Sequence, residues 1–381
     1  MLLFDTVPPW QVSNTINAPK IMLREPVANR PVSLPDKKVI HFTKCSSPEL
    51  DATLKTIKEA IVLPTYLANE ERRKIYDIKN EAVLQRDPVT MVVDGELVEF
   101  RYRSFTDLPN TNMAVRSAVM AMKTPGDFNN LWPLLEGVCG QANRNLDPAI
   151  LCRAIRGAAM AECLPVILEC IQGVKKTGFR LNRHEIVNQL LFALQDDALN
   201  SGWNKAETAK ALKRIQLVLD LLEGEPEHRA LAVRPGVELP FPLYRDPMVL
   251  AARLHIEAAL AVKHQQGKDV DGLVAKHTQQ LVQLWPEATG LLDLQPKTVQ
   301  SSNKGTKYLV HGDQFITFGS MVLSGLRLAA KVVEPELAGQ LEKRAALLEE
   351  QINTVLHGSN APSERSLGIH NKLLNEEPVE A

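Results

Sequence analysis

Apolar residues recur with a helical period along most of the chain from about residue 112 onward. In the middle third, this period predicts helices over residues 113–122, 131–138, 149–160, 164–174, 184–194 and 206–222. The first helices of successive pairs begin about 35 residues apart, which is typical of stacked helix hairpins. The pattern therefore predicts three antiparallel helix pairs packed one against the next.

One segment departs from the helical period. The apolar run 91–93 is followed by Asp94-Gly95 and then by an alternating run over 97–102. Asp-Gly between two such runs is typical of the two-residue type I′ turn. We expect one β-hairpin here, packed against helices because an isolated hairpin is barely stable in water.

The ends of the chain have a different composition from the middle. Six prolines in the first 35 residues exclude a packed helix there, and the last residues contain little apolar surface to bury. The predicted organisation is an extended proline-rich arm (1–46), N-terminal helices with the β-hairpin (47–110), the helix-hairpin region (111–224), a linker (225–245), a C-terminal helical region (246–357) and a disordered acidic tail (358–381).

Composition adds limits on the environment and the partners of the chain. Its 44 Lys and Arg residues nearly balance 45 Asp and Glu residues, so any nucleic-acid contact must come from a local patch. The five cysteines form no CxxC pair, which favours reduced thiols in a reducing compartment. No apolar run approaches the roughly 20 residues of a membrane span, and the N-terminus lacks the pattern of a secretory signal.

Motifs for catalysis and cofactor binding are missing from the sequence. It contains no phosphate-binding GxxxxGK[ST] loop, no GxGxxG after a strand and no GxSxG elbow. His184-Glu185 begins like a zinc-protease motif, but position 188 is Asn where the second histidine would stand. We therefore expect a protein that is not an enzyme, with no cofactor, no metal and no small-molecule substrate.

Basic residues gather in the central helix hairpin, where the acidic residues are Glu162 and Glu169. Such a cluster suits RNA phosphates, because the apolar faces of a repeat array are already used in stacking. An ordinary solvated rim is the alternative interpretation. The basic residues of this predicted RNA-binding site are Arg153, Arg156, Lys175, Lys176, Arg180 and Arg183.

The segment 148–182, PAILCRAIRGAAMAECLPVILECIQGVKKTGFRLN, resembles a pentatricopeptide repeat. Its most specific part is the turn KKTGF, in which Gly178 is expected to end the second helix in a left-handed cap while Phe179 folds back. The resemblance implies a mostly α fold: a right-handed array of antiparallel helix hairpins, here with one small β-hairpin and extended termini. It also places Cys152 and Asn182 at the two base-reading positions, and so implies that Asn182 belongs to the predicted RNA-binding site. A thiol is a weak hydrogen-bonding group, so Cys152 argues for docking and against a base-by-base code.

The order of features is also similar to that of fungal mitochondrial proteins of the translation machinery. It comprises the proline-rich arm, the element VLPTYLANEERRKIYD, whose EERRK run we expect to be a solvated helix face, and degenerate helical repeats. This resemblance implies a non-catalytic structural subunit of the mitochondrial ribosome, with the large subunit as the expected particle. It implies ribosomal RNA and ribosomal proteins as partners, and the mitochondrial matrix as the location. The alternatives are an organellar RNA-binding factor in RNA processing or translation activation, and a protein-binding adaptor in cytosol or nucleus.

Overall fold

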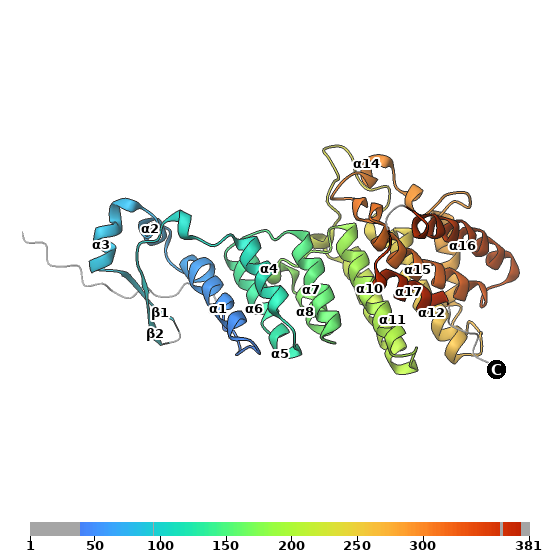
Figure 1. The fold of residues 1–381 in the computed structure, drawn as a ribbon, viewed down its shortest axis with the longest axis horizontal. Helices are drawn as coiled ribbons and strands as arrows, with labels where there is room; N and C mark the ends of the chain where they lie inside the picture. Colours follow the sequence, from blue (N-terminus) through green and yellow to red (C-terminus); the bar gives the residue numbers. More distant parts are fainter. Residues whose placement is uncertain (1–38, 94, 359–360, 375–381) are drawn as a thin grey trace, which may run out of the picture.

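The computed structural model describes residues 39–93, 95–358 and 361–374. Within these residues the chain is mostly helical, with one two-stranded antiparallel sheet, which confirms the predicted fold class. Figure 1 shows an elongated molecule in which layers of helices follow one another along the longest axis, from the β-hairpin at one end to a C-terminal bundle at the other. No helix in the described ranges is both long and apolar enough to cross a membrane.

The N-terminal part begins with a helix that the sequence specifies well. Pro48 occupies its first turn, and Leu50, Leu54 and Ile57 form its buried stripe; the helix packs on α4 (Thr111–Ala121). A π-helical turn, Lys58–Val62, continues this helix. The elements of this part are α1 (Pro48–Ile57), α2 (Asn69–Lys74), α3 (Glu81–Arg86), β1 (Val89–Val93) and β2 (Glu96–Phe100).

The predicted β-hairpin is present. Its two strands are antiparallel with Val93 opposite Glu96, and Gly95 has a φ of +84° at the turn. Met91 on β1 is buried, whereas Leu97 on β2 is 61% exposed, so the alternation of the strands gives one inner and one outer face. The inner face packs on the N-terminal helices, as an isolated hairpin requires.

The middle third forms the predicted helix pairs. The first helices make a continuous row, because α1 packs on α4, α4 on α7, α7 on α10 and α10 on α12. One hydrophobic core therefore runs along the stack. The elements are α4 (Thr111–Ala121), α5 (Pro125–Phe128), α6 (Leu131–Leu135) with its π-helical continuation (Glu136–Gln141), α7 (Pro148–Met160), α8 (Leu164–Gln172), α9 (Val174–Thr177), α10 (His184–Asn200) and α11 (Lys205–Gly224).

The C-terminal region is a bundle around one helix, α15, which packs on three of its neighbours, α12, α16 and α17. Most residues of α15 are buried, so its apolar surface is the core of this region. The elements are α12 (Pro247–His264), α13 (Leu273–Leu284), α14 (Lys297–Gln300), α15 (Gly312–Ala330), α16 (Pro335–Leu356) and α17 (Glu364–Leu374).

Helix α17 corrects the prediction that the tail 358–381 is disordered. Three residues on one face of this helix, Ser366, His370 and Leu373, are buried. The Ser366 hydroxyl donates to the carboxylate of Asp313 at 2.9 Å, and His370 Nδ1 lies 2.8 Å from the hydroxyl of Ser320 on α15. Polar contacts with α15 therefore hold α17 in place, although the tail has little apolar surface to bury. The last seven residues, 375–381, lie outside the described residues.

The predicted extended arm, 1–46, lies outside the described residues up to residue 38. Residues 39–46 form neither helix nor strand, and they are fastened to the end of α5. The Ser46 backbone N–H and hydroxyl each donate to Asp127 at 2.8 Å, and the Thr43 N–H donates to Asn130 at 2.7 Å. Although burial alone raises the pKa of Asp127, the hydrogen bonds from Ser46 and from the backbone N–H groups of Lys123 and Thr124 hold it below its ordinary value.

Candidate nucleic-acid interface

The turn at the centre of the predicted RNA-binding site has the expected geometry. Gly178 ends α9 with φ +64° and ψ 13°, and Phe179 is fully buried. The hydroxyl of Thr177 accepts the backbone N–H of Phe179 at 3.2 Å and donates to the carbonyl of Cys170 at 2.6 Å. The left-handed cap predicted from KKTGF is therefore confirmed.

Two of the predicted RNA-binding residues are neutralised by carboxylates from the segment 225–228. Lys175 Nζ lies 3.3 Å from the carboxylate of Glu225, and Arg180 Nε donates to Glu227 at 2.9 Å. In the same segment, His228 Nδ1 accepts a hydrogen bond from the backbone N–H of Leu181 at 3.1 Å. The region expected to be a linker thus packs on the basic turn and supplies acidic partners that a count of neighbouring residues along the sequence overlooks.

The remaining predicted site residues are spread over several elements. Arg156 on α7 donates to the side chain of Gln189 at 2.9 Å, and burial lowers the pKa of its guanidinium. Arg183 donates to a backbone carbonyl, that of Asn303, at 3.2 Å. Arg153 is half-buried on α7, and Lys176 is exposed on α9.

The two positions aligned with base readers differ in access. Cys152 is fully buried, and burial raises the pKa of its thiol to about 12, so it has no contact with solvent through which a base could reach it. Asn182 is half-buried, and its backbone carbonyl accepts the N–H of Leu231 at 3.1 Å. The geometry therefore offers no pair of side chains for reading a base at this repeat.

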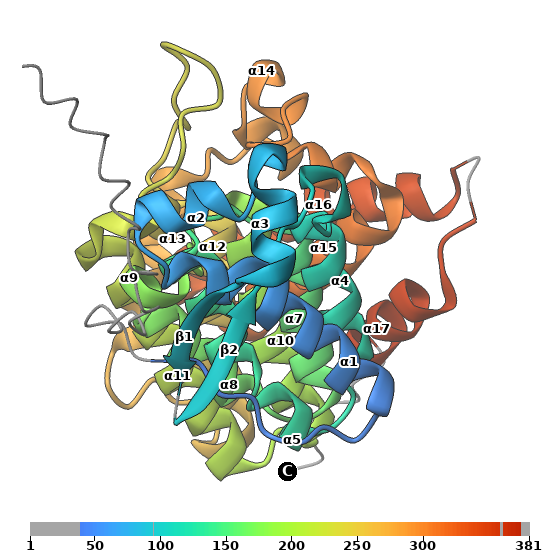
Figure 2. The same cartoon turned by 90° about the vertical axis from the view of Figure 1, so that its left-hand side faces the viewer.

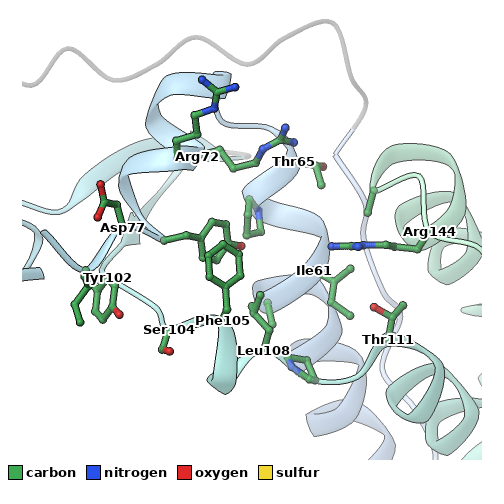
Figure 3. A pocket seen from close by; sticks show the side chains of 17 residues that line it. Ile61, Thr65, Arg72, Asp77, Tyr102, Ser104, Phe105, Leu108, Thr111 and Arg144 are labelled. Atoms are coloured by element: carbon green, nitrogen blue, oxygen red, sulfur yellow. The ribbon is translucent and has the colours of Figure 1, made fainter. Parts of the chain in front are cut away.

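A second cationic site lies at the N-terminal end, where the sequence predicted only a solvated helix face. A cleft of about 920 Å³ lies between α2, the continuation of α1 and the segment that leads into α4. Figure 3 shows Phe105 in the middle of this cleft, with Arg72 above it and Arg144 directed toward it from the other side. The three residues are far apart in the sequence, so the EERRK run alone could not indicate this site.

Two comparisons with known proteins point to one family. The family model described as mitochondrial ribosomal protein mS27 matches residues 28–373 of the chain. The chain belongs to the mS27 family of mitochondrial ribosomal proteins. A relative from Neurospora crassa, named small ribosomal subunit protein mS27, is 40% identical over 328 residues, which cover 82% of each chain.

Membership of the mS27 family confirms a mitochondrial ribosomal protein and corrects one expectation. The relative is a protein of the small ribosomal subunit, so the expected large-subunit assignment is wrong. That assignment followed only the general order of features, and neither a proline-rich arm nor a helical array distinguishes one ribosomal subunit from the other. The pentatricopeptide resemblance stays a prediction, because the family match does not test it.

The family is one of structural, non-enzymatic proteins. One buried polar cluster of this mS27 chain joins three of its elements. His184 Nε2 lies 3.3 Å from the carboxylate of Asp246, and His184 Nδ1 lies 2.7 Å from the hydroxyl of Tyr308. All three side chains are buried, which closes the cluster to a substrate. The cluster joins α10, the start of α12 and the segment before α15, so its role is to hold these elements together.

Proposed function

We propose that this mS27-family chain is a structural, non-catalytic subunit of the small subunit of the mitochondrial ribosome, and that it acts in the mitochondrial matrix. The observation that carries the proposal is the 40% identity to a small-subunit protein over 82% of each chain. Similarity over that length supports a shared docking surface as well as a shared fold, because the compared region covers almost the whole helical array.

The shape of the molecule fits a docking role on ribosomal RNA and neighbouring proteins. An elongated stack offers long edges to its surroundings, while its apolar helix faces are used between the layers (Figure 1). Several large apolar side chains stay exposed at the hairpin end, among them Ile78, Val83, Leu97 and Phe105. Apolar side chains gathered at one end of a protein mark a surface for a partner.

The test is sedimentation of the tagged full-length chain from mitochondrial lysate. In a gradient at low magnesium, which separates the two ribosomal subunits, we expect the chain to travel with the small-subunit RNA. RNase treatment should move it to lighter fractions. A chain found with the large subunit would contradict the proposal, and so would an RNase-sensitive chain in fractions without either subunit, because an RNA-processing factor would show that behaviour.

A further inference from the structure

The cleft at the N-terminal end has an aromatic floor that is open on one side. The rings of Phe105 and Tyr76 are stacked, with centroids 5.0 Å apart and planes inclined by 22°. Phe105 is nevertheless 69% exposed, so the ring face that Tyr76 does not cover is available to a ligand. An aromatic face held rigidly by a second ring is the surface on which a nucleic-acid base stacks.

Most of the charged groups around this floor are positive. Arg72, Arg73 and Arg144 line the cleft, and Asp77 is the one carboxylate among its lining residues. Within the part of the chain that the structure describes, none of these three arginines forms an ion pair, in contrast to the paired Lys175 of the central turn. Arg72 donates instead to the neutral side chain of Asn69 at 3.0 Å.

The side chain of Tyr76, which stacks on Phe105, is affected by the charges of three arginines. Burial raises the pKa of Tyr76, and the positive charges of Arg103, Arg72 and Arg144 oppose that rise, in that order. Three guanidinium groups are thus within electrostatic reach of the phenol under Phe105. Figure 2 shows the end of the molecule on which they lie, with α2, α3 and the β-hairpin facing the viewer.

A second hollow of about 700 Å³ continues the surface past Tyr76 and Tyr102. Two carboxylates line it, and each is paired with a cation: Glu59 with Lys55 at 3.9 Å and Glu99 with Arg101 at 3.1 Å. Lys58 and Arg103 also line it, and they have no ion pair among the described residues. The volume of the cleft around Phe105 lies within the range of roughly 300–1,000 Å³ that is typical of ligand pockets, so the cleft is large enough for one base and its sugar. The second hollow gives the phosphates of adjoining nucleotides a cationic path.

We propose that this cleft binds single-stranded RNA, with one unpaired base stacked on the open face of Phe105 and the flanking phosphates on Arg72, Arg73 and Arg144. The inference rests on the proposed function for the source of that RNA, an unpaired segment of the ribosomal RNA. The open ring face of Phe105 beside unpaired guanidinium groups favours RNA over a protein partner, because a base stacks on the ring while Arg binds the flanking phosphates and releases their counterions.

The experiment uses the full-length chain and a fluorescein-labelled, ten-nucleotide single-stranded RNA of mixed sequence, with fluorescence anisotropy as the readout. Phe105→Ala and Phe105→Leu should each weaken binding about tenfold, because both remove the stacking face. Phe105→Trp should stay within about twofold of the wild type. If Phe105→Leu bound RNA like the wild type, the ring would serve apolar docking, and the proposal would be overturned.

The charge contribution is measured through the salt dependence. Arg144→Gln should weaken binding about fivefold at low salt and reduce the slope of log K against log salt by about 0.7, the value for one phosphate contact on a single strand. Arg116→Gln is the matched control, because Arg116 is exposed on α4 outside both hollows. Equal effects of the two substitutions would overturn the proposal, since they would indicate binding by general charge.

A photo-cross-link locates the RNA directly. With 4-thiouridine in the oligonucleotide, we expect cross-linked peptides from residues 71–78 and 102–108. Cross-links confined to residues 175–183 would overturn the proposal. A chain that travels with the small subunit but binds RNA independently of Phe105 would refute the cleft alone. A chain that never travels with it, yet binds RNA through Phe105, would refute the proposed function alone.

Discussion

Replacing Gly178 with alanine tests how the central hairpin is closed. The φ of +64° at this residue lies in the region that L-residues adopt at a cost. An added Cβ would also lie 2.6 Å from the Cβ of Cys139, a distance that real side chains do not show. Neither group can easily retreat, because an added Cβ on Gly140 would lie 2.2 Å from the backbone carbonyl oxygen of Lys176, so the two backbones already touch.

The magnitude is the sum of these two effects. The left-handed conformation costs a non-glycine residue about 1–2 kcal/mol, and an overpacked contact costs about 1–3 kcal/mol. The smaller entropy of the unfolded alanine chain offsets about 0.4–1 kcal/mol of this. We therefore expect Gly178→Ala to lower the free energy of unfolding by about 2–4 kcal/mol.

Gly202 provides the control that separates the two effects. It has nearly the same φ, +65°, and an added Cβ there has nothing within 4 Å. Gly202→Ala should cost only the conformational part, about 1 kcal/mol. Adding Cys139→Gly to Gly178→Ala should recover the contact part, whereas Cys139→Ala should not, because the close atom is the Cβ.

Urea unfolding followed by circular dichroism measures the total effect, and hydrogen exchange of the peptides that contain residues 174–181 measures it locally. The local measurement matters because a chain built of repeats can unfold in steps. If Gly178→Ala destabilised the protein no more than Gly202→Ala, the contact with Cys139 would contribute nothing, and the reasoning would be refuted.

Three further predictions concern the C-terminal bundle and the basic turn. Burial lowers the pKa of His255 to about 3, so its contribution to stability is complete above pH 6.5 and is lost as the pH falls. The free energy of unfolding should drop by about 2 kcal/mol between pH 7 and pH 5, and His255→Asn should remove this part of the pH dependence. Gly325→Ala places a Cβ 2.8 Å from that of His255 and should cost about 1–3 kcal/mol in urea unfolding, whereas Gly339→Ala, with nothing within 4 Å, should be neutral or stabilising. Glu225→Gln releases Lys175 and should raise the affinity for single-stranded RNA at low salt; unchanged affinity would show that the basic turn does not contact RNA.

Features that depend on neighbouring residues were predictable from the sequence. The hairpin followed from a turn pair between alternating runs, and the helix pairs followed from their period and spacing. The cap at Gly178 followed from five adjacent residues, KKTGF. In each of these, the residues that determine the conformation lie within one turn or one helix, where sequence distance and spatial distance agree.

Helix α17 shows where that agreement ends. Its segment contains too little apolar surface to predict a packed helix, because its stability comes from partners 50 or more residues away. The Ser366 contact with Asp313 and the His370 contact with Ser320 exist only after α15 is in place. A polar helix of this kind folds onto a finished surface, and periodicity within the helix carries little of that information.

The same reasoning decides which basic residues could be recognised as a site. A run of basic residues in the sequence is a site only if no acidic residue from elsewhere neutralises it after folding. Lys175 and Arg180 were predicted from such a run, and Glu225 and Glu227 arrive from about 50 residues further along. The sequence predicts Arg72 to be part of a solvated face, but folding brings it to the stacked ring of Phe105 and leaves it without an ion pair among the described residues. Because ion pairing nearly cancels the field of a charge beyond a few ångströms, the residues left unpaired by the fold determine where an RNA phosphate can bind.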